Sequence, residues 1–166
     1  MPPQFHARPT DAPVVARLES EGLHPVLARL AASRGIDTCD DLDTALGRLH
    51  PPSQLLHAEA MASILADAIA AGRRLLIVGD YDADGATASA VGALALGRFG
   101  ATVETLVPNR FDYGYGLTPE IVRVAAERRP DSIVTVDNGI ASLDGVEEAR
   151  KLGIPTFLHE SNAEPG

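Results

Sequence analysis

The segment GDYDADG places three aspartates, Asp80, Asp82 and Asp84, at alternate positions directly after the apolar run LLIV. Carboxylates this close repel one another, and the repulsion raises their pKa values unless a cation relieves it. Carboxylate oxygens are ligands that suit Mg²⁺ or Mn²⁺. A single aspartate commonly decorates a turn, but three behind one buried run favour a metal site.

A fourth aspartate, Asp137, follows a second apolar run, SIVTV, and precedes Asn138 and Gly139, which favour a sharp turn. If Asp137 meets the first three aspartates, two metal ions about 4 Å apart could activate a water and stabilise the leaving oxygen of a phosphoryl transfer. We expect Gly79 and Gly85 to permit tight turns and close approach of a ligand to the backbone.

The segment PNRFDYGYG offers groups for binding a phosphate and a base. Arg110 is a planar, permanently charged donor that suits phosphate oxygens, and Asn109 could donate to the same phosphate or to a metal-bound water. Tyr113 and Tyr115 could stack on a base. The alternative is an ordinary turn in which Arg110 pairs with Asp112.

Composition limits how such a chain can meet nucleic acid. The net charge of −9 has the wrong sign for a simple nucleic-acid binder. Divalent metals or a basic partner domain would have to supply the positive charge. Cys39 is the only cysteine, which excludes an internal disulfide and a cysteine zinc site. No membrane span or signal peptide is visible, so we expect a cytoplasmic protein.

The order of predicted elements indicates an α/β fold, a Rossmann-like parallel sheet flanked by helices, with a short helical N-terminal extension. We expect two domains, an arm with the helical extension at 1–54 and the α/β domain at 55–166. The predicted helices are 24–35, 37–49, 56–72, 86–100, 117–129 and 142–153, and the predicted strands are 75–78, 101–107, 132–136 and 154–158. Thr118 and Ser142 are the expected N-caps of the last two helices.

Parallel sheets of this kind bind ligands at the carboxyl ends of their strands. The three polar segments described above each follow a predicted strand, so they should share one edge of the sheet. His159 follows the last predicted strand, and it is either a further metal ligand at that edge or an exposed loop histidine.

Three stretches, VGDYDADGATASA, VPNRFDYGYGL and VTVDNGI, together resemble in order the first three motifs of the RecJ family, bacterial single-strand-specific exonucleases of the DHH phosphoesterase superfamily. The resemblance runs from about residue 22 to about residue 153. It implies 5′-to-3′ hydrolysis of single-stranded DNA with Mn²⁺ or Mg²⁺, in recombination and repair.

The resemblance also implies roles for individual residues. It makes Asp82, Asp84 and Asp137 metal ligands, with Asp80 either a further ligand or a near neighbour of one. All four aspartates are the expected catalytic residues. It makes Asn109 and Arg110 contacts of the phosphate or the substrate. The expected substrate-binding set comprises Asn109, Arg110, Tyr115, Asn138 and Gly139.

The family's fourth motif, Asp-His-His, has no counterpart in the last residues, PTFLHESNAEPG. The second catalytic domain and the DNA-binding modules are also missing from the printed sequence. We therefore expect an incomplete, weakly active or inactive fragment whose partners are single-stranded DNA and the missing C-terminal domain. Its exposed interdomain surface could drive self-association. A shortened or shifted reading frame and divergence of the motif remain open as explanations.

Two other functions remain open from the residues alone. LLIVGDYDADGAT superficially fits a haloacid-dehalogenase-type phosphatase, in which an aspartate is the nucleophile. However, Thr87 lies one position too late for the usual D-x-D-G-T pattern, and the DNG segment has no role there. The second alternative is a non-catalytic fragment that binds a metal or a partner.

Overall fold

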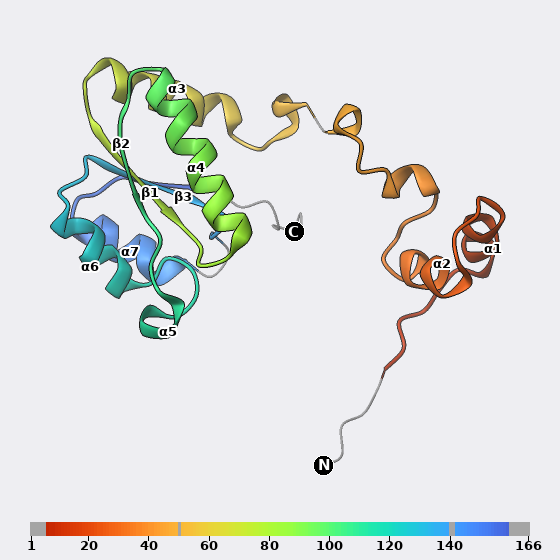
Figure 1. The fold of residues 1–166 in the computed structure, drawn as a ribbon. Helices are drawn as coiled ribbons and strands as arrows, with labels where there is room; N and C mark the ends of the chain where they lie inside the picture. The colour runs from red at the N-terminus through yellow and green to blue at the C-terminus, as the bar shows by residue number, and fades with distance from the viewer. Residues whose placement is uncertain (1–5, 50, 140–141, 160–166) are drawn as a thin grey trace, which may run out of the picture. The chain divides into compact units, whose positions relative to one another are not determined.

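The computed structural model describes residues 6–49, 51–139 and 142–159. The chain divides into two compact units, Met1–Leu55 and Leu56–Gly166, which are described separately below (Figure 1). Within the described residues, no helix is both long and apolar enough to cross a membrane.

The first unit contains two short helices, α1 (Ala12–Ser20) and α2 (Pro25–Ala32). They pack together around Leu18, which is fully buried. Helix α2 confirms the predicted helix, with Pro25 in its first turn. The His24 side chain caps it by accepting a hydrogen bond from the backbone N–H of Val26. Helix α1 was not predicted, since its first residues fall in the Pro-rich arm.

The helix predicted at 37–49 is wrong. The structure has two 3-10 turns there, Cys39–Leu42 and Leu46–Arg48. The Asp41 carboxylate accepts hydrogen bonds from the backbone N–H and the hydroxyl of Thr38. Such short-range bonds give the backbone an alternative to the α-helix, and the aspartate-rich sequence of this segment favours them.

The second unit is a four-stranded parallel sheet in the order β2-β1-β3-β4, with helices on both faces, which confirms the predicted α/β fold (Figure 1). Its elements, in chain order, are α3 (Ala58–Ala70), β1 (Arg74–Gly79), α4 (Ala83–Arg98), β2 (Thr102–Leu106), α5 (Arg110–Tyr113), α6 (Pro119–Glu127), β3 (Ser132–Val136), α7 (Leu143–Lys151) and β4 (Thr156–His159). All four predicted strands are present.

Strand β1 lies inside the sheet, and helices cover both of its faces. Leu76 and Val78 join a core cluster with residues of β3, α6 and α7 on one face. Leu75 and Ile77 point to the other face, where Gly92 of α4 lies close to the Ile77 side chain. Burying each such side chain stabilises the fold by about 1.5–3 kcal/mol, which explains why LLIV has no polar residue.

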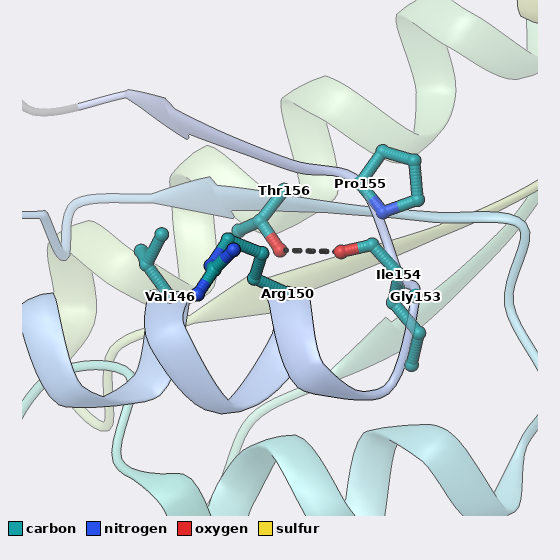
Figure 2. A pocket seen from close by; sticks show the side chains of 6 residues that line it. All are labelled: Val146, Arg150, Gly153, Ile154, Pro155 and Thr156. Atoms are coloured by element: carbon teal, nitrogen blue, oxygen red, sulfur yellow. Dashed lines mark hydrogen bonds between the residues drawn. The ribbon is translucent and has the colours of Figure 1, made fainter.

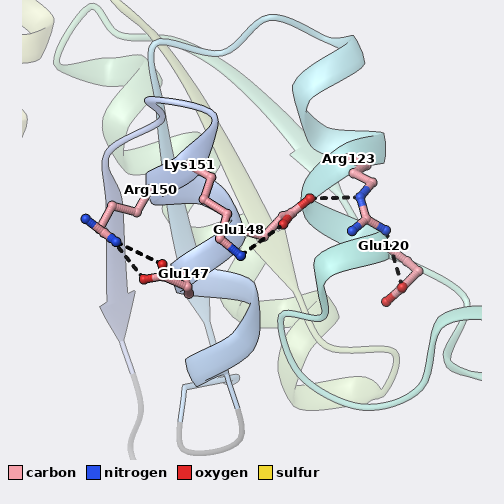
Figure 3. A network of polar contacts seen from close by, with 6 residues as sticks. All are labelled: Glu120, Arg123, Glu147, Glu148, Arg150 and Lys151. Atoms are coloured by element: carbon pink, nitrogen blue, oxygen red, sulfur yellow. Dashed lines mark hydrogen bonds and ion pairs between the residues drawn. The ribbon is translucent and has the colours of Figure 1, made fainter.

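Helices α6 and α7 are also joined on their outer surface by the ion-pair network in Figure 3. Arg123 of α6 lies 2.8 Å from Glu148 of α7, and Arg150 forms two hydrogen bonds with Glu147 one turn earlier. The bond from Arg150 lowers the pKa of Glu147 below its ordinary value. Exposed pairs of this kind contribute little to stability, because solvent and salt screen their attraction.

The two predicted N-caps behave differently. The Thr118 hydroxyl accepts a hydrogen bond from the backbone N–H of Ile121, so Thr118 caps α6 as predicted. Ser142 occupies the N-cap position of α7, but its hydroxyl accepts a hydrogen bond from the backbone N–H of Leu117 instead. The buried Ser142 therefore ties α7 to the loop before α6.

Candidate functional site

The three motifs lie at one edge of the sheet, where the order of the strands reverses. After β1 the chain crosses to β2 on one side, and after β2 it returns past β1 to β3 on the other side. Open α/β sheets bind ligands outside the carboxyl ends of their strands at such a switch point. Asp80 follows β1 and Asp137 follows β3, so both aspartates flank it.

Arg110 joins the segment after β2 to the segment after β1. Its Nη2 atom lies 2.9 Å from Oδ2 of Asp80 and 3.4 Å from Oδ2 of Asp82. The hydrogen bond to Asp80 raises the pKa of Arg110 above its usual value, so the guanidinium stays charged. Its Nε is buried and has no hydrogen-bond partner within the described part of the chain.

The alternative pairing of Arg110 with Asp112 is wrong. The Asp112 carboxylate instead accepts a hydrogen bond from Nδ2 of Asn109, at 2.9 Å. The side-chain oxygen of Asn109 accepts another from the backbone N–H of Phe111, so Asn109 caps α5. Asn109 therefore shapes the short helix that starts at Arg110.

Helix α4 begins inside the aspartate motif, three residues earlier than predicted. Asp82 is its N-cap, and its Oδ1 accepts a hydrogen bond from the backbone N–H of Gly85, 2.9 Å away. Asp84 lies exposed in the first helical turn. A carboxylate at a helix N-terminus is stabilised by the helix dipole, which offsets part of the repulsion in the motif.

The glycines beside the motif serve packing rather than tight turning. Neither Gly79 nor Gly85 has a positive φ angle. A Cβ added to Gly85 would lie 2.6 Å from the backbone nitrogen of Asp80 and 2.7 Å from its carbonyl carbon. The first turn of α4 therefore packs directly on the backbone that carries Asp80, and the tight turns expected at these glycines are wrong.

The sharp turn after β3 occurs at Asp137 itself, whose φ is +57°. Few residues other than glycine adopt this conformation, although aspartate and asparagine tolerate it best. Asn138 is only 6% exposed, and its Nδ2 donates to the carbonyl oxygen of Val78 in β1 at 3.4 Å. Asn138 thus ties the ends of β1 and β3 together, and Gly139 follows it half-buried.

The two predicted stacking tyrosines have other contacts. Tyr113 is half-buried against the core cluster, and its stacking on a base stays a prediction. The Tyr115 ring lies under the guanidinium of Arg110, with 4.5 Å from Cζ to the ring centroid, a cation–π contact. A second aromatic contact at this edge, between Tyr81 and Phe111, was missed in the sequence.

The donor chemistry of the four aspartates fits a hard divalent cation, because their carboxylates offer only oxygen atoms. Asp80 and Asp82 each direct one carboxylate oxygen at the same positive charge, that of Arg110. Within the described residues, however, no three histidine, cysteine or carboxylate side chains are gathered closely enough to hold an ion. The ligand roles of the four aspartates therefore stay predictions.

Two further regions add nothing to this site. Strand β4 ends at His159, whose side chain lies outside the described part of the structure, so its metal role stays a prediction. A cavity of about 340 Å³ lies between the end of α7 and the start of β4, and Figure 2 shows the side chains that line it. Because Thr156 opens β4, this cavity lies at the amino edge of the sheet, away from the aspartates.

Comparison with known proteins identifies the family. Residues 74–164 match the pattern described as "DHH family, N-terminal domain". The single-stranded-DNA-specific exonuclease RecJ of Escherichia coli is 45% identical over 95% of this chain, and that of Bacillus subtilis is 32% identical over 96%. The chain spans only 27% and 21% of these relatives.

Solved structures agree with the sequence relatives. The crystal structure of an exonuclease RecJ bound to manganese matches with a TM-score of 0.60 and 30% identity, over 71% of this chain and 31% of that one. RecJ from Thermus thermophilus in complex with Mn²⁺ matches with a TM-score of 0.56 and 29% identity, over 92% and 22%.

These matches extend past residue 153, where the resemblance in the three motifs ends. They give no support to a haloacid-dehalogenase-type phosphatase. The matched residues contain the parallel sheet and the three motifs at its carboxyl edge. The chain therefore belongs to the DHH family, with that family's N-terminal domain at residues 74–164.

Proposed function

We propose that this chain supplies the metal- and phosphate-binding part of a RecJ-like 5′-to-3′ exonuclease, which hydrolyses phosphodiester bonds of single-stranded DNA in recombination and repair. The observation that carries the proposal is the convergence of Asp80 and Asp82 on Arg110 at the switch point of the sheet. Because the chain spans about a quarter of its relatives, we propose weak or no hydrolysis by this chain alone.

The four aspartates are the proposed ligands of Mn²⁺ or Mg²⁺, with Asp80, Asp82 and Asp84 contributed from β1 and α4 and Asp137 from β3. A divalent cation held there would polarise an attacking water and neutralise charge on the phosphate. The need for such a cation follows from the net charge of −9, which otherwise repels a phosphate backbone.

Arg110 is the proposed phosphate contact. Its guanidinium is a planar donor that can hold two phosphate oxygens at once, and Tyr115 supports the face of that plane. In this structure the same guanidinium neutralises Asp80 and Asp82. We therefore propose that cation binding to these carboxylates releases Arg110 toward the phosphate.

The test is the binding of a single-stranded hexanucleotide that carries a 5′ phosphate and a fluorescent label at its 3′ end. Binding is measured by fluorescence anisotropy with and without Mn²⁺. We expect binding that requires Mn²⁺ and that Asp137→Asn weakens by about tenfold or more, because the change removes one ligand charge. Asp67→Asn, the same chemical change on exposed α3, is the control and should bind like the unchanged chain. Binding that is independent of Mn²⁺ and of Asp137 would refute the proposal.

A further inference from the structure

An exposed aromatic pair lies beside the ion pair at the carboxyl edge. The rings of Tyr81 and Phe111 have centroids 6.4 Å apart and meet edge to face at 79°. Phe111 is nevertheless 87% exposed, and Tyr81 is 46% exposed. The chain has three tyrosines, four phenylalanines and no tryptophan. Aromatic residues are therefore few, and two of them lie exposed at the candidate site.

The aromatic pair lies next to the ion pair in the sequence, one residue later in each of the two segments. Asp80 pairs with Arg110, and the next residues, Tyr81 and Phe111, contact each other. The segments after β1 and β2 are therefore joined twice, once by charge and once by an aromatic contact worth about 0.5–1.5 kcal/mol. Such a double connection fixes the position of the Phe111 ring relative to the Arg110 guanidinium.

The contact does not explain the exposure of Phe111. Burial of apolar surface is favourable, yet the Phe111 ring meets Tyr81 in an edge-to-face pair and still leaves most of its surface in solvent. Of the two tyrosines suggested by the sequence, Tyr113 is half-buried against the core cluster, and Arg110 covers one face of the Tyr115 ring, which is 67% exposed.

We infer that Phe111, braced by Tyr81, is a stacking platform for one nucleobase of a single strand whose phosphate lies at Arg110. The inference rests on the proposed function and adds the residues that hold the base. Base-on-aromatic stacking is sequence-tolerant and supplies about 1–3 kcal/mol per base. In an acidic chain, stacking provides affinity that phosphate contacts alone would not, and it selects single strands because duplex bases are already stacked.

The test compares two 5′-phosphorylated single strands of equal length and charge, one with bases and one fully abasic, by fluorescence anisotropy in Mn²⁺. Phe111→Ala should weaken binding of the strand with bases by about 5- to 100-fold and leave the abasic strand unchanged. Phe111→Trp should retain the affinity for bases. The control is Phe99→Ala, since Phe99 is a similarly exposed phenylalanine at the far end of α4.

The outcomes separate the two ideas. If Phe111→Ala weakens both strands equally, Phe111 shapes the site without stacking on a base, and if it weakens neither, Phe111 has no role in binding. Either result overturns the inference and leaves the proposed function standing. If the unchanged chain binds neither strand in Mn²⁺, the proposed function fails, and the inference fails with it.

Discussion

At the scale of single residues, the feature that matters most is the position of Arg110 between two carboxylates. Its guanidinium lies 2.9 Å from Asp80 and 3.4 Å from Asp82, so it pairs with two of the carboxylates that we propose as ligands of a divalent cation. Arg110 therefore lowers the repulsion between these aspartates in this structure, and a metal ion bound as proposed would have to compete with it for them. The same side chain cannot satisfy the carboxylates and a phosphate equally well.

Removing this competitor should strengthen metal binding. We predict that Arg110→Gln increases the Mn²⁺ affinity of the chain by about fivefold or more, measured by isothermal titration calorimetry, because a positive charge beside the ligands is lost. Arg128→Gln is the control, since Arg128 bonds the carbonyl oxygen of Thr105 away from the aspartates. An unchanged or weaker Mn²⁺ affinity in Arg110→Gln would show that the two cations do not compete.

At the scale of elements, the site depends on how closely α4 packs on the end of β1. The Asp80 backbone lies against Gly85, and Asp82 caps the same helix. Two carboxylates are thus positioned by one helix start. The ion pair of Arg123 with Glu148 joins α6 to α7 on the other face of the sheet.

A matched pair of glycine substitutions in α4 tests this packing. Gly85→Ala should lower the free energy of unfolding by about 1–3 kcal/mol, because its Cβ would overlap the Asp80 backbone. Gly97→Ala, with nothing within 4 Å of the added Cβ, should raise it by up to about 1 kcal/mol through helix propensity. Urea unfolding measures both. Equal effects of the two changes would mean that α4 does not need a glycine beside Asp80.

The ion pair of Glu147 with Arg150 on α7 predicts that the stability of the fold depends on pH. The pKa of Glu147 is lowered in the folded state by Arg150, so its contribution to stability is present above the ordinary value of 4.5 and is lost as pH falls through the folded pKa. Glu147→Gln should therefore lower the melting temperature at about pH 7 but not at about pH 3. Glu127→Gln, at the end of α6, is the control. A difference that persists at low pH would contradict this origin.

The sequence predicts the α/β core well because the physical signals there are local and strong. Short runs such as LLIV and SIVTV, bounded by turn residues and alternating with helices, favour buried parallel strands, and the motifs that follow such strands share an edge of the sheet. The segment 37–49 misleads because aspartate side chains compete with the helical backbone. The partner of Arg110 and the use of Asp82 as an N-cap depend on the packing of α4, which spacing alone does not contain.

At the scale of the whole molecule, the chain separates into two compact units, and every candidate site residue lies in the second. The first unit has its own small core around Leu18, Ala28 and Ala31. This division lies close to the boundary proposed at residues 54 and 55. Self-association through exposed apolar surface, such as that of Val91 and Leu94 on α4, stays a prediction.

The second unit is compact by itself, so it should fold and bind a metal ion without the first. We predict that residues 56–166 alone fold cooperatively and bind Mn²⁺ within about twofold of the full chain, because the proposed ligands and the sheet are all contained there. Circular dichroism and calorimetry measure the two properties. Loss of folding or of Mn²⁺ binding in 56–166 would show that the first unit is part of the site's scaffold.

The central claim is that the carboxyl edge of this sheet binds a divalent cation through aspartates from β1, α4 and β3. The most direct test is Mn²⁺ titration of the unchanged chain, Asp82→Asn and Asp137→Asn by calorimetry. Asparagine still caps a helix and tolerates the positive φ of residue 137, so both variants should keep their melting temperatures. The account predicts Mn²⁺ binding that each change weakens by about tenfold or more; equal Mn²⁺ affinity in all three proteins, or none in the unchanged chain, would contradict it.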